Sequence, residues 1–446
     1  MTWSPYPHYK DAGAAWLGEI PAHWTVGSFS KFGRFEGGSG FPHEFQGETA
    51  EEVPFHKVNA LARATQAGRL KSRDDTVSRA TARRLGAKVL PAYSVVFAKV
   101  GAALLLGRIA SLSEESCIDN NMMAFLPGDK VTPEFARHLL AQVRFDLLVN
   151  PGAVPSVSEG QMKRLLTAVP PIKEQRGIAA FLDRETAKID ALIAKQEQLI
   201  ATLREDRTAT ITHAVTKGLD ADVEMVECGD AMVPASPMHW TQKTQLKRLA
   251  SVQTGLTLGK TVERDKAVSV PYLRVANVQS AGVNLEEVKT VEVARADLSN
   301  YLLRAGDVLM TEGGDIDKLG RGCLWSDEIS PCIHQNHVFA VRCSGRLRSE
   351  FLVYLLDTSV ARNYFFMTAK KTTNLASTNS TTLGGFSFAL PPRAEQDRIV
   401  QFLDGRCSNI DNLIAQALAI INTLREYRAA LITDAVTGKI DVRGVA

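Results

Sequence analysis

PPIKEQRGIAAFLDRETAKIDALIAKQEQLIATLRE, residues 170 to 205, is written twice in this chain of 446 residues. The second copy, residues 391 to 426, reads PPRAEQDRIVQFLDGRCSNIDNLIAQALAIINTLRE, and half or nearly half of its positions are identical. Matched residues always lie 221 positions apart (395 − 174), and no gap is needed anywhere between Pro170 and Asp220. Because gapless identity over such a length is hard to obtain by chance, the two stretches indicate an internal repeat.

Each copy has the start signal and the period of a long amphipathic helix. A Pro-Pro pair stands at or before the first turn, where a missing N–H costs little, and an acidic residue follows near the positive end of the helix dipole. Apolar residues then recur at spacings of three, four or seven, as in the seam of a coiled coil. The predicted seam of the second copy is Leu403, Ile410, Leu413, Ala417, Ile420, Leu424, Tyr427 and Leu431. The predicted seam of the first copy is more polar: Leu182, Ile189, Leu192, Gln196, Leu199, Leu203, Asp206 and Thr210.

Two such helices in one chain most simply bury their stripes against each other. The alternative is a pair of unrelated amphipathic helices, each packed on its own core. We expect the helix pair, with Leu182, Ile189, Leu192, Leu199, Leu203, Leu403, Ile410, Leu413, Ile420, Leu424 and Leu431 as its pairing residues.

Length and composition describe a multidomain globular protein. The chain is too long for one core and predicts two to four domains, and its 45% hydrophobic content is ordinary. No basic region followed by an apolar run opens the sequence, and no stretch of eighteen apolar residues occurs, so we expect a cytoplasmic protein without a membrane span. The six cysteines are scattered without CxxC pairs, which favours reduced structural thiols over disulfides or zinc.

The two segments before the helices also repeat each other. Residues 25–169 and 241–390 mix short apolar runs with Gly, Pro and polar clusters, which predicts strand-rich α/β or α+β domains. Short segments, 1–24 and 221–240, precede them, and the helical segments are 170–220 and 391–441. The matching landmarks are Val53-Pro54-Phe55 with Val270-Pro271-Tyr272, Gly107-Arg108 with Gly320-Arg321, Ile118 with Ile333, and Asn121 with Asn336.

Between these landmarks the residues differ almost completely. A shared scaffold with divergent loops predicts one kind of task performed on two different targets, because loops carry function while scaffold positions carry packing. The chain is therefore expected to alternate domain, long helix, domain, long helix.

The helical motif PP..EQ..I..FLD.....ID.LI......I..LRE.R...I..AVT, used twice and preceded by domains that open with IPAHW or PMHW, resembles the specificity subunit of type I restriction–modification enzymes. The resemblance spans essentially the whole chain. It implies two target recognition domains, each reading one half of a split DNA sequence, and an antiparallel coiled coil that spaces them. It also implies partners: double-stranded DNA, two DNA methyltransferase subunits, and restriction or motor subunits held through them. The methyl donor, ATP and magnesium would belong to those partners, so this chain is expected to bind no cofactor and no metal.

Basic residues cluster where a DNA reader would need them. Arginine and lysine contacts to phosphates fix register, while bidentate Arg or Asn contacts to base edges carry sequence information. The candidates for DNA contact are Arg63, Arg69, Lys71, Arg73, Lys99, Arg108, Lys318, Arg321, Lys370 and Lys371. The run from residue 61 to 90 could equally be a solvated helix face. Since Arg108 and Arg321 occupy matching positions, a shared phosphate or scaffold role suits them better than sequence reading.

Other motifs do not support catalysis by this chain. GLTLGKT, residues 255 to 261, has one residue too few between its glycines for a phosphate-binding loop. The acidic run EGGDIDK, residues 312 to 318, is more typical of a turn than of a metal-dependent nuclease site, and His334 and His337 fit opposite faces of a strand. Two other hypotheses remain besides the recognition subunit: an autonomous nuclease or methyltransferase, and a coiled-coil interaction scaffold without a DNA role.

Overall fold

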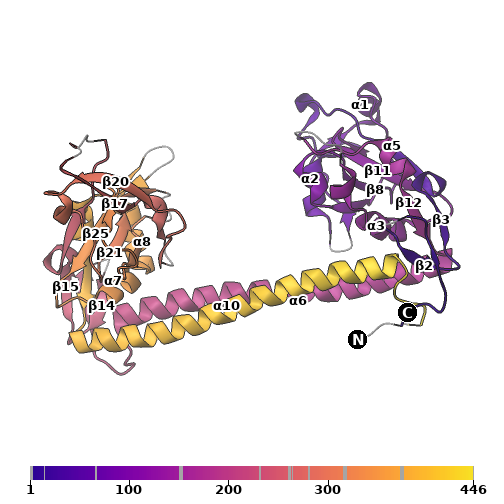
Figure 1. The fold of residues 1–446 in the computed structure, drawn as a ribbon. Helices are drawn as coiled ribbons and strands as arrows, with labels where there is room; N and C mark the ends of the chain where they lie inside the picture. Colours follow the sequence, from indigo (N-terminus) through magenta and orange to yellow (C-terminus); the bar gives the residue numbers. More distant parts are fainter. Residues whose placement is uncertain are drawn as a thin grey trace. The chain divides into compact units, whose positions relative to one another are not determined.

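A computed structural model describes residues 4–14, 16–65, 68–149, 154–230, 233–259, 263, 265–279, 282–314, 319–371 and 376–444. The chain divides into two compact units. Unit 1 comprises Met1–Glu197 with Leu418–Ala446, and unit 2 comprises Gln198–Ala417. Each unit is a globular mixed α/β part together with one segment of each long helix, α6 (Ile172–Lys217) and α10 (Arg393–Val436). In each unit the two helix segments lie side by side and antiparallel (Figure 1).

The globular part of unit 1 contains two main sheets, ordered β4-β11-β8-β9-β6 and β10-β5-β7, and a smaller pair, β3-β12. Their strands are β3 (Thr25–Ser28), β4 (Gly33–Gly37), β5 (Val53–His56), β6 (Arg69–Leu70), β7 (Thr76–Val77), β8 (Val95–Ala98), β9 (Ile109–Leu112), β10 (Cys117–Ile118), β11 (Met122–Pro127) and β12 (Leu166–Val169). The helices are α1 (Arg79–Arg84), α2 (Ala102–Leu105), α3 (Pro133–Ala141), α4 (Phe145–Leu148) and α5 (Glu159–Arg164).

Unit 2 repeats this framework. Its sheets run β16-β25-β21-β23 and β20-β17-β24, again beside a smaller pair, β15-β28. The strands are β15 (Thr241–Gln245), β16 (Ala250–Thr254), β17 (Ala267–Leu273), β20 (Lys289–Ala294), β21 (Val308–Thr311), β23 (Gly322–Leu324), β24 (Ile333–His334), β25 (Val338–Cys343) and β28 (Ser387–Leu390). The helices are α7 (Ser349–Leu356), α8 (Ser359–Thr368) and α9 (Ser380–Gly385). Smaller ribbons are β13 (Met225–Asp230) with β14 (Val233–Pro237), β18 (Val278–Gln279) with β19 (Gly282–Val283), and β22 (Gly313–Gly314), β27 (Ala376–Ser377) and β26 (Lys370–Lys371).

Strand pairing corrects one alignment made from the sequence. The parallel pair β10-β5 sets Ile118 opposite His56, and the parallel pair β24-β17 sets His334 opposite Leu273. Ile118 therefore corresponds to His334, 216 residues on (334 − 118), and not to Ile333. Asn121 likewise corresponds to His337 and not to Asn336. The identical Ile and Asn residues favoured a register that is one position off, and backbone hydrogen bonds fix the true one.

The long helices carry a regular heptad seam. Buried or half-buried positions on α6 alternate at spacings of four and three: Leu182, Thr186, Ile189, Ile193, Gln196, Ile200, Leu203, Arg207, Thr210 and Ala214. The matching positions on α10, 221 residues on, are also buried or half-buried: Leu403, Cys407, Ile410, Ile414, Ala417, Ile421, Leu424, Arg428, Leu431 and Ala435. A strict seven-residue repeat of this kind is the signature of coiled-coil packing.

Six of the sixteen predicted seam residues lie one position away from the observed seam. Leu192, Leu199, Leu413 and Ile420 are 44 to 47% exposed, while their neighbours Ile193, Ile200, Ile414 and Ile421 take the seam positions. Asp206 is also replaced, by Arg207, and the exposed Tyr427 by Arg428. The remaining predicted pairing residues, Leu182, Ile189, Leu203, Leu403, Ile410, Leu424 and Leu431, are buried or half-buried on the seam.

The arginine within the seam has equivalent ion pairs in both units. In unit 1, Arg428 Nε lies 3.0 Å from Asp190 Oδ1. In unit 2, Arg207 Nε lies 3.6 Å from Asp411 Oδ1, and its Nη1 donates to Asp357 at 3.0 Å. Arg207 and Arg428 are 221 residues apart, and so are Asp190 and Asp411. The repeat therefore extends from sequence to side-chain contacts.

The repeated Glu-Gln pair fixes the start of each long helix. Gln175 is fully buried; it accepts the Thr132 N–H and donates to the carbonyl oxygens of Lys130 and Pro170, each at 2.8 Å. Gln396, also fully buried, accepts the Arg348 N–H at 2.8 Å and donates to two carbonyl oxygens, of Arg346 and Pro391, at 2.9 Å. Each glutamine thus ties a long helix to the beginning of the helix, α3 or α7, that packs beside it.

The neighbouring glutamate holds the entry segment of each domain. In unit 1 the Glu174 carboxylate accepts hydrogen bonds from Tyr6 and Trp24 at 2.6 and 2.8 Å, and His23 lies 2.8 Å from its other oxygen. In unit 2, His239 lies 2.8 Å from Glu395. Unit 1 builds this corner from both chain ends, since the Asp441 N–H donates to the Ser4 carbonyl at 2.8 Å.

Candidate nucleic-acid interface

Several arginines of the predicted basic run in unit 1 are held by acidic side chains. Arg63 lies 2.8 Å from Asp74, and Arg73 donates to Glu114 at 2.6 Å and to the Glu51 carbonyl at 2.6 Å. Other members of the run behave alike: Arg79 pairs with Glu115, Lys88 with Glu36, and the Arg84 guanidinium lies over the Phe45 ring. These contacts favour the solvated-face interpretation for this part of the run, because exposed ion pairs already satisfy the cations.

A second group of predicted cations has no acidic partner among the described residues. Within the described part of the chain, no acidic group lies within ion-pair distance of Arg69, Lys71, Lys99, Arg108 or Lys370. Arg69 instead lies over the Tyr93 ring, 5.1 Å from its centroid. Lys71, Arg108 and Lys370 are exposed and Lys99 is half-buried. These side chains keep donors available for phosphate or base contacts.

Arg321 lies in a different environment from its counterpart Arg108. It is half-buried and lines a cleft of about 1130 Å³ in unit 2 together with charged residues of α6, α7 and α10, among them Arg207, Glu350 and Asp404. Arg108 is exposed just before β9. The shared role expected for the two arginines from their matching positions is therefore not visible in their surroundings.

Part of the predicted interface lies outside the described residues. Lys318 and the acidic residues Asp315 and Asp317 fall there, as do Lys260 and Thr261 of the GLTLGKT stretch. Lys371 belongs to β26, but only its backbone is described. The other acidic residue of that run, Glu312, accepts from or donates to His337 Nδ1 at 2.7 Å, depending on the histidine tautomer and the carboxyl proton.

The predicted strand containing His334 and His337 is interrupted. His334 ends β24, is fully buried and has Nδ1 2.6 Å from the Val338 carbonyl, whereas the exposed His337 precedes β25. Burial lowers the pKa of His334. The described residues contain no group of three or more His, Cys, Asp or Glu side chains arranged to hold a metal ion. Among the same residues, no helix is apolar over a long enough run to cross a bilayer.

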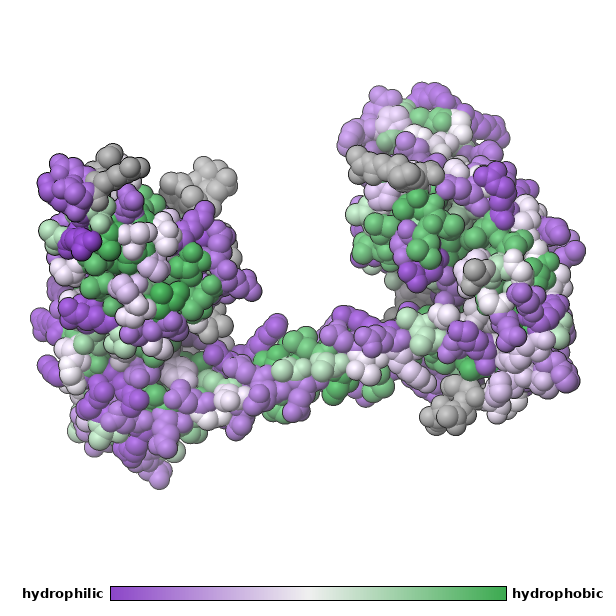
Figure 2. Space-filling model, viewed as in Figure 1, coloured by the Kyte–Doolittle hydropathy of each residue, from purple (hydrophilic) through white to green (hydrophobic). Residues whose placement is uncertain are grey.

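The helices expose apolar side chains beside the seam (Figure 2). In unit 1 these include Leu192, Leu418, Ile420 and Tyr427, at 45 to 48% exposure, and in unit 2 they include Leu199, Phe402 and Leu413, at 44 to 47%. Five of them occupy the same position of the heptad, directly before a seam residue: Leu192, Leu199, Leu413, Ile420 and Tyr427. We call these five residues the flanking stripe. A coiled coil needs only its seam apolar, so the stripe is surplus to the pairing of these two helices.

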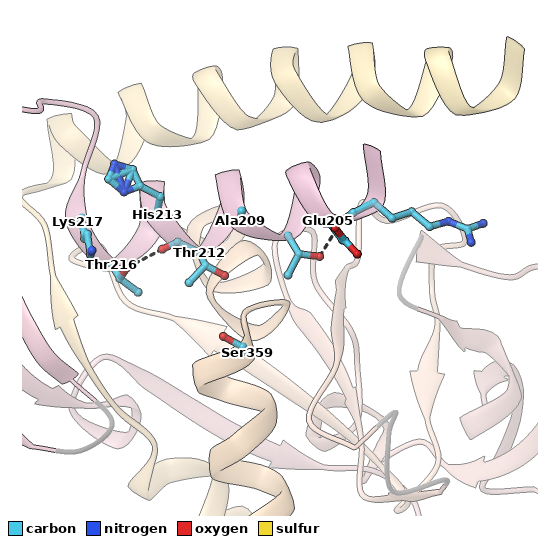
Figure 3. Close-up of a pocket in the computed structure, with 9 residues that line it drawn as sticks. Glu205, Ala209, Thr212, His213, Thr216, Lys217 and Ser359 are labelled. Carbon is cyan, nitrogen blue, oxygen red and sulfur yellow. Dashed lines mark hydrogen bonds between the residues drawn. The ribbon is translucent and has the colours of Figure 1, made fainter. Parts of the chain in front are cut away.

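A groove in unit 2 lies along one side of α6 (Figure 3). It encloses about 630 Å³ and is lined by α6 residues from Arg204 to Lys217 and by Ser359 at the start of α8. The Thr208 and Thr216 hydroxyls donate to the carbonyls four residues earlier, at 3.1 and 2.6 Å. Their methyl groups, Ala209 and the stems of long charged side chains form much of the wall.

Acid should destabilise unit 1 through His56, which ends β5 and is 4% exposed. Burial lowers the pKa of His56 from 6.5 to about 4, against the opposing charges of Glu114 and Asp74. Below pH 6.5 His56 binds a proton in the unfolded chain but not in the folded unit. The free energy of unfolding of unit 1 therefore falls as the pH drops from 6.5 towards 4, by about 3 kcal/mol in all. Hydrogen exchange of β5 and β10 amides at pH 7.5 and pH 5 measures this loss. His56→Gln should reduce the difference and leave a remainder, because burial also lowers the pKa of His138 in the same unit. A full pH effect in that variant would exclude His56 as a source.

Comparisons with known proteins show what the chain is similar to. The fold is that of two solved structures: the HsdS subunit from Thermoanaerobacter tengcongensis (TM-score 0.53, 16% identity) and a chain from a study of assembly and conformational transition of the type I R-M system (TM-score 0.63, 18% identity). Each alignment covers 94% of this chain and 98% of the other. No protein-family model matches the chain.

The sequence relatives are more specific. The type I restriction enzyme EcoKI specificity subunit of Escherichia coli K12 is 24% identical over 264 residues, which are 58% of this chain and 54% of that protein. The chain thus spans about half the length of the curated relative it matches. The resemblance to type I specificity subunits predicted from the repeated helix is confirmed.

Proposed function

We propose that this chain is a non-catalytic DNA-recognition subunit of a type I restriction–modification complex. Residues 25–169 and 241–390 read two different half-sites of an asymmetric DNA sequence, and the helical segments 170–220 and 391–441 set the gap between them. Segments 1–24 and 221–240 lead into the two readers. Methyltransferase subunits dock on the chain and carry the chemistry, with restriction subunits joining through them.

One observation carries this proposal: a single framework occurs twice with different surface residues. The sheet orders β4-β11-β8-β9 and β16-β25-β21-β23 correspond strand for strand, and the helix starts are held by the same glutamine contacts. An asymmetric split site needs two non-identical readers on equivalent supports. Half-sites read from one side of B-DNA lie about one turn apart, roughly 34 to 36 Å, which long spacer helices can bridge.

Selection from random duplex DNA tests the proposal. A purified complex of this chain with its methyltransferase subunits should enrich a motif of two unequal parts separated by a fixed unspecified gap. Enrichment should be lost when the chain is omitted, and binding should weaken steeply with salt because phosphate contacts release counterions. A complex that binds DNA without enriching any motif would instead favour the coiled-coil scaffold without a DNA role.

The flanking stripe supplies a prediction about partner docking. Leu413→Glu should weaken methyltransferase binding at least tenfold, because the charge would be desolvated in a contact that the free chain leaves open to water. Helix content and thermal stability should change little, since Leu413 is 47% exposed. The matched control is Ala415→Glu, on an exposed residue two positions further along α10 and so on a different face of the helix. Equal binding by the two variants in a titration with the methyltransferase would exclude the stripe as the docking surface.

A further inference from the structure

In each globular domain, three neighbouring antiparallel strands have one terminus at the same edge of the sheet: two strands end there and the one between them begins there. In unit 1, β4 ends at Gly37, β8 is followed by Lys99, and β11 is preceded by Asn121. The Lys99 N–H donates to the Asn121 carbonyl at 2.8 Å, and Gly37 pairs with Met123, two residues after Asn121. We call Gly37, Lys99 and Asn121 rim site 1.

Unit 2 places three residues at the equivalent strand ends. Thr254 ends β16, Glu312 follows β21, and His337 precedes β25. The Glu312 N–H donates to the His337 carbonyl at 2.9 Å, and Thr254 pairs with Phe339. We call Thr254, Glu312 and His337 rim site 2. Since the backbone contacts correspond one to one, the two rim sites present their side chains from the same place in the framework.

The backbone beneath both rims is fixed by a glycine that follows the first strand. A side chain on Gly38 would come within 1.9 Å of the Asp119 carbonyl oxygen, and one on Gly255 within 2.1 Å of the His334 carbonyl oxygen. The adjoining bridges are parallel in both domains, Ser39 with Asp119 and Leu256 with Gln335. The backbone beneath the rim sites is therefore the same in both domains, whereas the side chains at the two rim sites differ.

The chemistry of those side chains is inverted between the domains. Rim site 1 offers a lysine ammonium, half-buried over Gly37, and an exposed asparagine amide. Rim site 2 offers a carboxylate, 32% exposed, beside the 56% exposed imidazole of His337. Next to rim site 2, the exposed Lys370 pairs with Ser377, the same residue that pairs with Gly313 on the other side. Rim site 2 therefore carries a hydrogen-bond acceptor, Glu312, and has beside it a lysine, Lys370, that can contact a phosphate.

We infer that the two rim sites are the sequence-reading positions of the two domains. This inference rests on the proposed DNA-recognition function. In rim site 1, Lys99 donates to guanine O6 and N7, while the Asn121 amide donates to adenine N7 and accepts from adenine N6. Rim site 2 accepts through Glu312 and reads a base that presents an exocyclic amino group, such as cytosine N4. The two half-sites differ because the equivalent positions 99 and 312 carry a donor-only lysine and an acceptor-only carboxylate.

Exchange of the rims tests the inference in the complete complex with its methyltransferase subunits. One variant combines Lys99→Glu with Asn121→His, and its reciprocal combines Glu312→Lys with His337→Asn. Selection from random duplex DNA should show altered base preference, by about tenfold or more at one or more positions, only in the half-site read by the changed domain. Lys99→Gln serves as a milder variant, because a glutamate at 99 would face the buried Asp119 carboxylate.

The matched controls reverse exposed ion pairs away from the rims, Arg144–Asp146 in unit 1 and Lys266–Glu263 in unit 2. Both controls should retain the wild-type motif. Rim variants that keep the wild-type motif would overturn the inference. Rim variants that stay folded but lose binding to every sequence equally would also overturn it, because that result indicates a phosphate or structural role. A wild-type complex that selects no motif would be a failure of the proposed function itself.

Discussion

Replacing Gln175 by alanine should destabilise unit 1 by about 3 to 5 kcal/mol. The side chain is fully buried and makes three hydrogen bonds, so its loss leaves the Thr132 N–H and two carbonyl oxygens without partners in the interior. Each unmade buried hydrogen bond costs about 1 to 3 kcal/mol. Amide hydrogen exchange should show faster opening of α3 and of the start of α6.

Gln396→Ala is the matched control in unit 2. It removes the equivalent contacts to Arg348, Arg346 and Pro391, so it should accelerate exchange in α7 and at the start of α10 while sparing α3. Gln175→Glu at neutral pH should destabilise unit 1 at least as much as Gln175→Ala, because it replaces both donors by a buried carboxylate facing the Lys130 and Pro170 carbonyl oxygens. Unchanged exchange in α3 of Gln175→Ala would contradict the anchoring role assigned to this residue.

A single alanine inserted after Glu197 should lower sequence-selective DNA binding at least a hundredfold. One extra residue rotates everything after it by about 100° around the helix axis, so Ile200 and Leu203 leave the seam on which they are buried or half-buried. A seven-residue insertion restores the heptad register because it adds nearly two whole turns. Placed after Glu197 and after Leu418, positions 221 residues apart, it should preserve the seam on both helices.

The seven-residue insertion should also change a second quantity, the length of the gap in the selected motif. Seven residues add about 10 Å of helix, so the gap in the selected motif should grow by roughly three base pairs while both half-sites stay unchanged. Selection from random duplex DNA compares the two insertions directly. Equal selective binding by the one-residue and seven-residue variants would show that seam register does not control recognition.

The sequence predicts the long helices and the duplicated framework because gapless repetition leaves few alternatives. It predicts only half of the seam. Residues 192 and 193, 199 and 200, 413 and 414, and 420 and 421 are all apolar pairs, and either member fits a spacing of three or four. Packing decides between them, and it also admits Thr186, Arg207 and Arg428, which no apolar pattern would include.

The candidate interface was harder to predict than the fold. The acidic partners of the basic run come from distant segments: Glu36 for Lys88, Glu114 for Arg73 and Glu115 for Arg79. Clustered charge alone could not separate these paired cations from Lys71, Lys99 and Arg108. From the sequence, Glu312 falls in an acidic turn and His337 in a strand. The backbone hydrogen bonds place them where Lys99 and Asn121 lie in unit 1.

Methylation mapping of genomic DNA tests the central claim most directly. The chain would be expressed with its methyltransferase subunit in a host without its own modification system. We expect a new methylated motif in two unequal halves with a fixed gap, absent when this chain is omitted. Methylation of the same motif without this chain would contradict the claim that the chain supplies sequence recognition.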